Sequence, residues 1–343
     1  MRMTVVLVGL SGWVFLHGQP SFSEKRERNQ TYNEGIDLIG QRQYEEAAMK
    51  FTRCLELDSA FPAAYLQRGR VWIEWGATDE AMNDFDRALE YDPSFGKAWF
   101  YKGYLLYEPD STDAALECFN RALENGYTDA WVYYFRALVR IGGEKFGMAM
   151  NDLNSAIAAR TGFALAYHER AGVKRMTGDL QGAHFDYQTA LEYQPHFPLA
   201  HNNRGSVRIL LGDYEGAVAD YTAAIRQDST MVIAWNNRGY ARNFLGDTEG
   251  ALDDFDTAIA RSDGYSLAVM NKASLLAASN QVTPAMSLMD EAVEQRPGKA
   301  LLYLNRGLIR EMTGDLEGAC EDWQKAGELG SMEAAGYLKE CQK

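Results

Sequence analysis

The chain has 343 residues, of which 46% are hydrophobic and 24% are charged, a composition that excludes disorder over most of its length. Its formal net charge of −14 disfavours nonspecific binding to nucleic acid or to an anionic membrane surface. A length of this order favours two domains, unless internal repeats build the fold.

Residues 1–23 have the features of a secretory signal peptide. Arg2 supplies a short basic start, an apolar run covers residues 4–16, and residues 21–23 form a small-x-small cleavage site. The alternatives are an uncleaved signal anchor and a misassigned start codon. No cysteine follows the apolar run, which argues against a bacterial lipoprotein, and no second run approaches membrane-spanning length. We expect export to the periplasm or the medium, with a cytoplasmic location as the alternative. Residues 24–27 are expected to form a short charged lead-in.

From residue 28 onward the sequence repeats every 34 residues without an insertion. One column of the repeat is always alanine: Ala47, Ala81, Ala115, Ala149, Ala183, Ala217, Ala251, Ala285 and Ala319. Four residues later the column is bulky: Phe51, Phe85, Phe119, Leu153, Tyr187, Tyr221, Phe255, Met289 and Trp323. Seven residues after the alanine column a small residue returns, and twelve residues before it stands another small column: Gly35, Gly69, Gly103, Ala137, Ala171, Gly205, Gly239, Ala273 and Gly307. This spacing predicts two amphipathic helices per unit, whose backbones approach closely at the small column.

Glycine and aspartate separate the two helices in several units. The glycine is expected to end the first helix and the aspartate to cap the second. The pairs are Gly178 with Asp179, Gly212 with Asp213, Gly246 with Asp247, and Gly314 with Asp315. Some units depart from this pattern, and in the third Pro109 stands in place of the usual glycine. In the eighth, Thr283 is expected to cap the second helix with Pro284 as its first residue, and "GGEKFG" in the fourth is expected to give a looser turn.

The combination of these columns at a period of 34 resembles the tetratricopeptide repeat. The resemblance implies an all-α fold, a right-handed α-solenoid superhelix of tandem helix–turn–helix units, with nine repeats over residues 28–333. Their predicted bounds are 28–61, 62–95, 96–129, 130–163, 164–197, 198–231, 232–265, 266–299 and 300–333. Residues 334–343 are expected to form a C-terminal capping helix. In this family the first helices line a concave groove that usually binds peptides or protein partners.

Asparagine recurs two residues before the small column in the last four repeats, at Asn203, Asn237, Asn271 and Asn305. The resemblance implies that this position points into the groove. An amide can pair with both halves of a peptide bond, so these side chains are candidates to hold an extended chain by its backbone. Asn202 and Asn236, one position earlier, are secondary candidates. The alternative is that these amides bond to neighbouring repeats or to water.

Aromatic residues replace the asparagines nearer the N-terminus. The candidates for an apolar contact with a partner are Tyr101, Tyr104, Tyr134 and Phe135. The alternative is that half of this cluster packs between helices. The groove is therefore expected to be aromatic towards the N-terminus and amide-lined towards the C-terminus.

A basic residue precedes the small column in repeats two to nine, and an aspartate follows sixteen residues after each of the six arginines. The arginine–aspartate pairs are Arg68 with Asp84, Arg136 with Asp152, Arg170 with Asp186, Arg204 with Asp220, Arg238 with Asp254, and Arg306 with Asp322. In the first repeat the charges are exchanged, with Glu34 before Lys50. Retention of opposite charge predicts an ion pair between the two helices of each repeat, and this argues against a phosphate-binding ladder.

We find no residue pattern for catalysis, for a metal or for a cofactor. The histidines lack ligand spacing, and no phosphate loop or nucleophile motif is present. Cys320 and Cys341 are the two cysteines placed to form a disulfide on neighbouring helices; the alternative is that all four cysteines are buried thiols. The expected function is that of a non-catalytic scaffold or adaptor that binds an extended polypeptide segment in the groove. The alternatives are an assembly or regulatory subunit of an envelope complex that binds a folded partner through an acidic convex surface, and an enzyme-associated targeting subunit.

Overall fold

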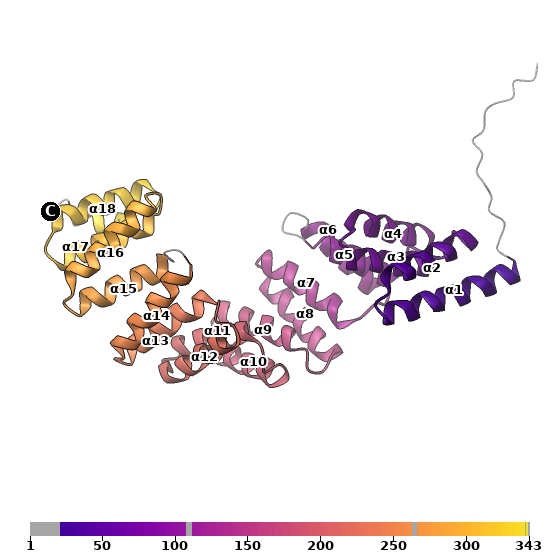
Figure 1. Cartoon of the computed structure of the whole chain (residues 1–343), viewed down its shortest axis with the longest axis horizontal. Coiled ribbons are helices and arrows are strands. Elements are labelled where there is room, and N and C mark those ends of the chain that lie inside the picture. The colour runs from indigo at the N-terminus through magenta and orange to yellow at the C-terminus, as the bar shows by residue number, and fades with distance from the viewer. Residues whose placement is uncertain (1–20, 108–111, 263–265, 340, 342–343) are drawn as a thin grey trace, which may run out of the picture. The chain divides into compact units, whose positions relative to one another are not determined.

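The computed structural model describes residues 21–107, 112–262, 266–339 and 341, and these residues form helices and turns without a β-strand. The chain divides into two compact units, one ending at Lys145 and the other beginning at Phe146. The helices of the first unit are α1 (Phe22–Gly40), α2 (Tyr44–Leu57), α3 (Pro62–Glu74), α4 (Thr78–Tyr91), α5 (Gly96–Leu105), α6 (Thr112–Glu124) and α7 (Ala130–Gly142) (Figure 1).

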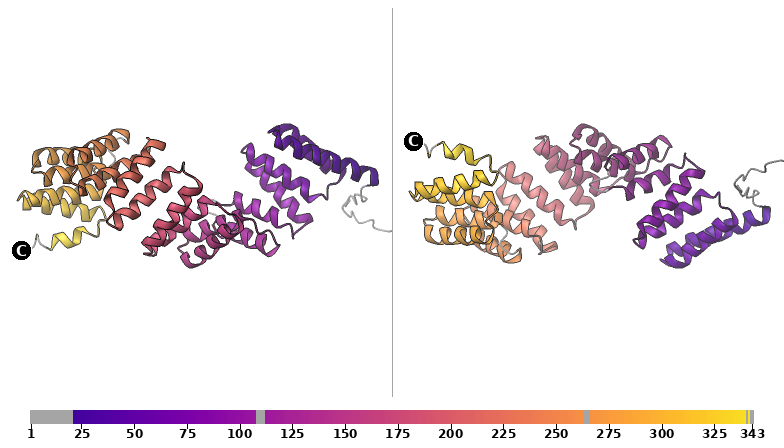
Figure 2. Two further views of the ribbon diagram at one scale, coloured as in Figure 1. Left: turned by 90° about the horizontal axis from the view of Figure 1, so that it is seen from below. Right: turned by 90° about the horizontal axis from the view of Figure 1, so that it is seen from above.

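The second unit continues with the same alternation of helices. They are α8 (Phe146–Ala159), α9 (Ala164–Met176), α10 (Leu180–Tyr193), α11 (Pro198–Leu210), α12 (Tyr214–Gln227), α13 (Val232–Phe244), α14 (Thr248–Arg261), α15 (Ser266–Ala278), α16 (Val282–Gln295), α17 (Ala300–Met312), α18 (Leu316–Glu328) and α19 (Ala334–Leu338). Within each unit, consecutive helices pack against each other in chain order, as the two further views show (Figure 2). The all-α fold of tandem helix pairs is therefore confirmed.

The helices follow the 34-residue period. From α3 to α17, the first helix of every pair begins at the first residue of a predicted repeat. The first pair begins earlier, since α1 starts at Phe22 and includes the expected lead-in at residues 24–27. Ser21 caps α1 in a reciprocal capping box with Glu24. Residues 1–20 of the predicted signal peptide lie outside the described residues. No helix in the described ranges is long and apolar enough to cross a membrane.

The turns within the repeats confirm the glycine and aspartate signals. Gly212 has φ +80°, and Asp213 accepts a hydrogen bond from the backbone N–H of Gly216 at 2.9 Å. The same arrangement occurs after α9, α13 and α17. In the eighth repeat the prediction for Thr283 is wrong. There Asn280 adopts the left-handed conformation with φ +60°, and α16 begins at Val282 in the common register.

The prediction of a looser turn in the fourth repeat is also wrong. Glu144 adopts φ +56°, and the N–H of Lys145 bonds to the carbonyl of Arg140 at 2.8 Å. The N–H of Asp213 makes the corresponding bond to Arg208 at 2.9 Å. A non-glycine residue therefore closes the same three-residue turn, at the cost of a less favourable backbone conformation.

Within each unit, the core lies between the helices of a pair and between successive pairs. The alanine column is fully buried throughout, and the bulky column is at most 2% exposed. The residues of the small column must be small because the bulky side chains of the second helix pack directly against them. A methyl group on Gly239 would lie 2.8 Å from the ring of Phe255 and 3.0 Å from the carbonyl oxygen of Ala251. The two helices of this repeat thus approach too closely for a side chain at this point.

Ion pairs join the two helices of six repeats, as predicted. Arg204 donates from Nε and Nη2 to the two carboxylate oxygens of Asp220, at 2.9 and 2.6 Å. The same bidentate geometry joins Arg68 to Asp84, Arg170 to Asp186, Arg238 to Asp254, and Arg306 to Asp322. Arg136 and Asp152 belong to different units, and their pairing stays a prediction. In the first repeat the exchanged pair also forms, with 2.6 Å between Lys50 Nζ and Glu34 Oε2.

A second cation on four of these aspartates, Asp186, Asp220, Asp254 and Asp322, was not predicted. Arg208 lies 3.0 Å from the Asp220 carboxylate, so this buried anion meets two guanidinium groups. Burial raises the pKa of Asp220, but the nearby His201 ring, the bonds from Arg204 and the charge of Arg208 lower it by more, so the net pKa is below its ordinary value. Lys174, Arg242 and Arg310 repeat the role of Arg208. These arginines and lysines are therefore engaged within the fold.

The C-terminal cap is shorter than predicted, since α19 covers only Ala334–Leu338. Tyr337 stacks on Trp323 of α18, with ring centres 5.0 Å apart. Cys320 and Cys341 form a disulfide that joins α18 to the residues after α19. Cys54 and Cys118 are free and buried, and burial raises the pKa of each thiol to about 11.

Candidate functional site

The first helices of repeats five to nine contact one another in chain order, from α9 through α11, α13 and α15 to α17. The four predicted asparagines occupy the sixth position of the last four of these helices and are half-buried: Asn203, Asn237, Asn271 and Asn305. We call the face of α11, α13, α15 and α17 that carries these four residues the amide face. It lies entirely within the second unit.

The asparagines bond to each other across the repeats. Asn271 donates from Nδ2 to Oδ1 of Asn236 in the preceding repeat at 2.8 Å, and Asn237 donates to Asn202 in the same way at 3.2 Å. Within a repeat, Asn236 donates to Asn237 and Asn202 donates to Asn203, both at 3.2 Å. Five amides therefore form one continuous hydrogen-bonded chain, in which every donor points in the same direction.

The chain ends on a histidine. Asn203 donates from Nδ2 to Nε2 of His168 at 3.1 Å. Since an amide nitrogen can only donate, this contact requires Nε2 to accept, which assigns the ring proton to Nδ1, 3.0 Å from a carboxylate oxygen of Glu169. Asn305 is not in the chain. In the preceding repeat, Met270 holds the column of Asn202 and Asn236 and offers no amide oxygen, so Asn305 donates to the carbonyl of Leu301 at 2.8 Å instead.

The two asparagine columns have different surroundings. Asn202 and Asn236 are only 3% and 5% exposed, so they orient their neighbours and offer little surface to a partner. Asn203 and Asn237 each use one N–H and one lone pair of their oxygen in the chain. An amide has two of each, so Asn237 keeps one donor and one acceptor and Asn203 keeps one acceptor, all held in a fixed orientation. The remaining N–H of Asn203 interacts with the hydroxyl of Tyr187. The asparagines therefore bond to neighbouring repeats, which was the alternative. These bonds still leave polar groups that could hold a peptide backbone, so the two hypotheses are compatible.

The same spacing links two side chains in the first unit. Gln67 occupies the asparagine column of the second repeat and donates to the hydroxyl of Tyr32 at 3.3 Å. Tyr32 lies in α1 at the position that Asn202 holds in α11. Contact between these two columns is therefore a property of the repeat, and asparagine at both columns gives the amide chain.

The predicted aromatic residues are divided between core and surface. Tyr134 is 7% exposed and belongs to the core, so it offers little surface to a partner. Phe135 is half-buried at the centre of a cluster, with ring centres 5.2 Å from Tyr104 and 5.7 Å from Trp131. Tyr104 is 41% exposed. Of the four residues, Tyr101 and Tyr104 are the ones that reach a cavity.

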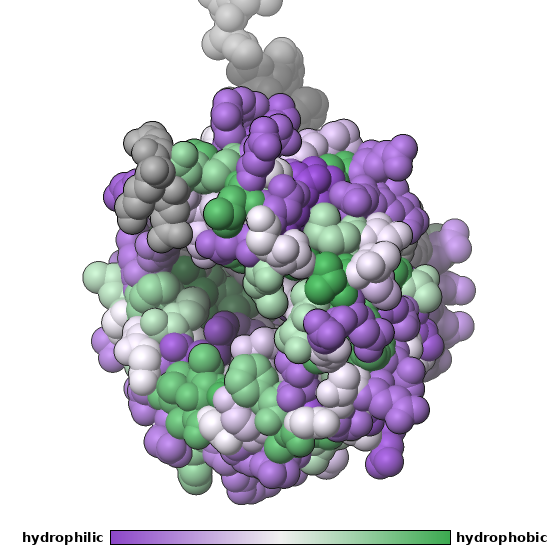
Figure 3. Space-filling view, turned by 90° about the vertical axis from the view of Figure 1, so that its left-hand side faces the viewer, coloured by the Kyte–Doolittle hydropathy of each residue, from purple (hydrophilic) through white to green (hydrophobic). Residues whose placement is uncertain are grey.

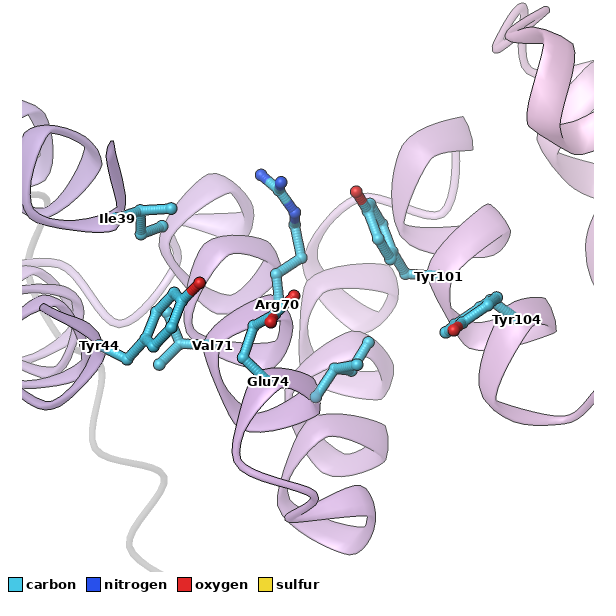
Figure 4. A pocket seen from close by; sticks show the side chains of 8 residues that line it. Ile39, Tyr44, Arg70, Val71, Glu74, Tyr101 and Tyr104 are labelled. Atoms are coloured by element: carbon cyan, nitrogen blue, oxygen red, sulfur yellow. The ribbon is translucent and has the colours of Figure 1, made fainter. Parts of the chain in front are cut away.

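That cavity has a volume of about 230 Å³ and lies within the first unit. It is lined by Ile39, Tyr44, Arg70, Val71, Ile73, Glu74, Tyr101 and Tyr104. Figure 4 shows that the side chains converge from α1, α2, α3 and α5, with Arg70 extending between Ile39 and Tyr101 (Figure 4). The cavity therefore combines apolar walls with two charged groups.

Electrostatics distinguish this cavity from the amide face. The Arg70 guanidinium lies 5.3 Å from the ring centre of Tyr101 and donates to Gln67 at 2.6 Å. Burial and the nearby charge of Arg70 lower the pKa of Lys97. Burial raises the pKa of Tyr127 to about 12, with smaller effects from Asp129 and Tyr101. A basic and aromatic environment thus occurs in the first unit.

Sequence reasoning missed Arg70 and Glu74 as cavity residues. Both lie on the same face of α3 as Gln67, three and seven residues further on, which is the spacing of neighbouring turns. Extending the groove column by these intervals would have found them. Among the described residues, no group of three or more histidine, cysteine or acidic side chains is placed to hold a metal ion.

Comparison with known proteins identifies the repeat. The family model of the tetratricopeptide repeat matches residues 76–130, 175–232, 211–266 and 236–300, together more than half of the chain. No curated protein matches the sequence. A tetratricopeptide repeat protein from Parabacteroides merdae has a similar structure, with a TM-score of 0.60 at 20% identity over 72% of this chain and 99% of that one.

Two further solved structures share this fold. PilF from Pseudomonas aeruginosa has a TM-score of 0.56 at 14% identity over 66% of this chain and 99% of that one. PilW, a type IV pilus biogenesis factor, has a TM-score of 0.52 at 19% identity over 58% and 92%. At these identities the likeness shows the fold alone. The repeat columns, the helix pairs and the family match together show that the chain belongs to the tetratricopeptide repeat family.

Proposed function

We propose that the protein is a non-catalytic scaffold whose amide face holds an extended polypeptide segment of a partner protein. Proteins of this family generally act as scaffolds for protein–protein interaction. The observation that supports the proposal most directly is the chain of amides from Asn271 to His168. It fixes the direction of each exposed asparagine, and preorganised groups lose little entropy when a ligand binds.

The amides suit a peptide backbone better than a folded surface. The N–H and the oxygen lone pair that Asn237 keeps complement one carbonyl and one N–H of an extended chain, and the oxygen of Asn203 accepts from a further N–H. Such a chain has unpaired backbone groups along its whole length, whereas those of a folded partner are satisfied internally. The cavity beside Tyr101 and Tyr104 in the first unit is a second contact point for the same class of partner.

Site-specific photo-crosslinking tests this proposal. We would replace one aromatic residue at a time by benzoylphenylalanine: Tyr240 on the amide face, Tyr104 at the cavity, and Phe185 on α10 as the matched control. All three are exposed and aromatic, so the replacements are comparable. Crosslinks to one partner segment from Tyr240, but not from Phe185, are expected. Crosslinks from Phe185 alone would refute the proposal and favour a partner bound to the second helices, which about 0.5 M salt should then release.

We also propose that the chain functions in an oxidising compartment. The signal-peptide features of residues 1–23 support export, and so does the disulfide between Cys320 and Cys341, since disulfides persist in the periplasm and outside cells. Fractionation of the source cells, with N-terminal sequencing of the mature protein, tests this. Recovery of an uncleaved chain with four free thiols in the cytoplasm would refute it.

A further inference from the structure

Two rows of apolar side chains flank the amides of the second unit. The second residue of each first helix is aliphatic and 43–46% exposed: Leu199, Ile233, Leu267 and Leu301. The last residue of each first helix is also apolar and exposed: Leu210, Phe244, Ala278 and Met312. We call these the entry row and the exit row. Figure 3 views the chain from the end where α17 and α18 lie, and apolar surface is exposed there between hydrophilic patches (Figure 3).

Both rows lie on the amide face. In α11, residues 199, 203, 206 and 210 are separated by four, three and four positions, which places them along one side of the helix. The same spacing holds in α13, α15 and α17. Because these helices contact one another in chain order, the asparagines form a central line with an apolar margin on each side. Bonds such as Asn237 to Asn202 join the lines from repeat to repeat.

Charge is absent from this surface. Four positions on each of four helices give sixteen residues, and none of them is charged, although 24% of the chain is. The corresponding positions of the first unit include Arg70, Glu74 and Lys97. An uncharged face on a protein of net charge −14 disfavours a charged ligand, because a buried charge without a partner is costly.

The step between repeats explains why both margins are alike. Packed helices lie about 8–10 Å apart, and one extended residue spans about 3.3 Å. The distance from one first helix to the next therefore corresponds to about three ligand residues. Side chains of an extended chain alternate in direction. With an odd number of residues per repeat, successive repeats meet opposite sides of the ligand, so both margins must accept the same kind of side chain.

From this geometry we infer that the amide face binds an extended, uncharged segment with apolar side chains on both sides of its backbone. The inference rests on the proposed function and specifies its partner class. The backbone lies on the asparagine line, and the side chains rest on the entry and exit rows. Specificity then comes from apolarity and the absence of charge, without a fixed sequence motif.

Synthetic peptides of about twelve residues, enough to span four repeats at the step above, test the inference. The first, labelled with fluorescein, repeats leucine, valine and serine; the second has the same length and label but contains serine, threonine and glycine only. Fluorescence anisotropy on the full chain measures both affinities. We expect the apolar peptide to bind about tenfold or more tightly, with little dependence on salt.

A charged variant tests the location. It replaces two residues of the entry row by acids and two of the exit row by bases: Leu199→Glu, Ile233→Glu, Leu210→Lys and Met312→Lys. Acids near a helix start and bases near a helix end suit the helix dipole, and all four positions are exposed, so the fold and net charge are retained. The control variant, Phe185→Glu with Met332→Lys, places one acid and one base at exposed residues off this face. The first variant should lose the apolar peptide and the second should retain it.

The outcomes separate the inference from the proposed function. Equal affinity for the two peptides would overturn the inference, while crosslinking from Tyr240 would still support backbone binding. Unchanged affinity in the charged variant would overturn it as well, because the peptide would then bind elsewhere. Binding of neither peptide would also overturn it, and the crosslinking experiment would decide the proposed function independently.

Discussion

Removing single asparagines should destabilise the second unit by amounts that follow the hydrogen-bonded chain. Asn237→Ala removes the partner of Asn202 Oδ1 and the partner of Asn236 Nδ2, both on side chains that are at most 5% exposed. A buried polar group without a partner costs about 1–2 kcal/mol here, so the expected loss in free energy of unfolding is about 2–4 kcal/mol. The gain in helix propensity from asparagine to alanine returns about 0.5 kcal/mol.

The other asparagines provide graded controls. Asn271→Ala leaves only Oδ1 of Asn236 without a partner, so its expected cost is about 1–2 kcal/mol. Asn305→Ala breaks only a bond to the carbonyl of Leu301 in its own helix, and its effect should stay within about 0.5 kcal/mol of zero. The order of stability is therefore wild type and Asn305→Ala, then Asn271→Ala, then Asn237→Ala.

Urea unfolding followed by far-UV circular dichroism measures this series. Because repeats unfold with limited cooperativity, the curves should be fitted with a nearest-neighbour description, and hydrogen exchange of the α11 and α13 amides gives the local value. Equal effects of Asn237→Ala and Asn305→Ala would refute the reasoning, since only the first interrupts the chain. The result also bears on binding experiments, because loss of a partner in Asn237→Ala must be corrected for loss of fold.

Three further predictions concern the core, the thiols and the response to acid. Gly239→Ala should destabilise by about 1–3 kcal/mol in thermal or urea unfolding, because its methyl group meets the facing ring and a backbone oxygen. Gly172→Ala, whose nearest atom is 3.7 Å away, should stabilise by about 0.5–1 kcal/mol; the same sign for both would contradict the packing described. A thiol reagent should label no cysteine in the native protein, two after unfolding and four after reduction, and a native count above zero would show that the Cys320–Cys341 bond or the burial of the free thiols is misplaced. The lowered pKa of Asp220 contributes stability that is fully present above about pH 4 and is lost as the pH falls through its folded value. The difference in unfolding free energy between wild type and Asp220→Asn should therefore shrink below about pH 4, and a difference that grew with acid would refute this assignment.

Much of the fold could be predicted because its determinants are local and repeated. Alanine, aromatic and glycine columns specify one helix pair, and nine copies reinforce the same register. The arginine–aspartate pair at sixteen residues was visible for the same reason. The second cation, such as Arg208, was missed. Basic residues at its position recur from repeat to repeat, but basic residues on an exposed helix face would give the same pattern.

The site was less predictable, because it depends on which side chains meet between repeats. Asparagine at two adjacent columns gave no indication that Asn202 would be buried and Asn203 half-exposed. Tyr134 was expected at the surface, yet it is buried, with its ring against those of Trp131 and Phe135. The residues of the entry row and the exit row are periodic in the sequence. Their places at the second and last positions of each first helix became clear only once the helix bounds were known.

The amide chain also determines how this surface could lengthen. His168 ends it at one side because its ring offers no amide, and Met270 ends it at the other. Between them, residues 198–231 and 232–265 carry identical asparagine pairs, so a duplicated copy of either repeat would insert with all its hydrogen bonds made. The surface can thus grow or shrink in steps of one repeat without redesign. The cavity of the first unit is assembled from unlike side chains on four helices and cannot be copied in this way.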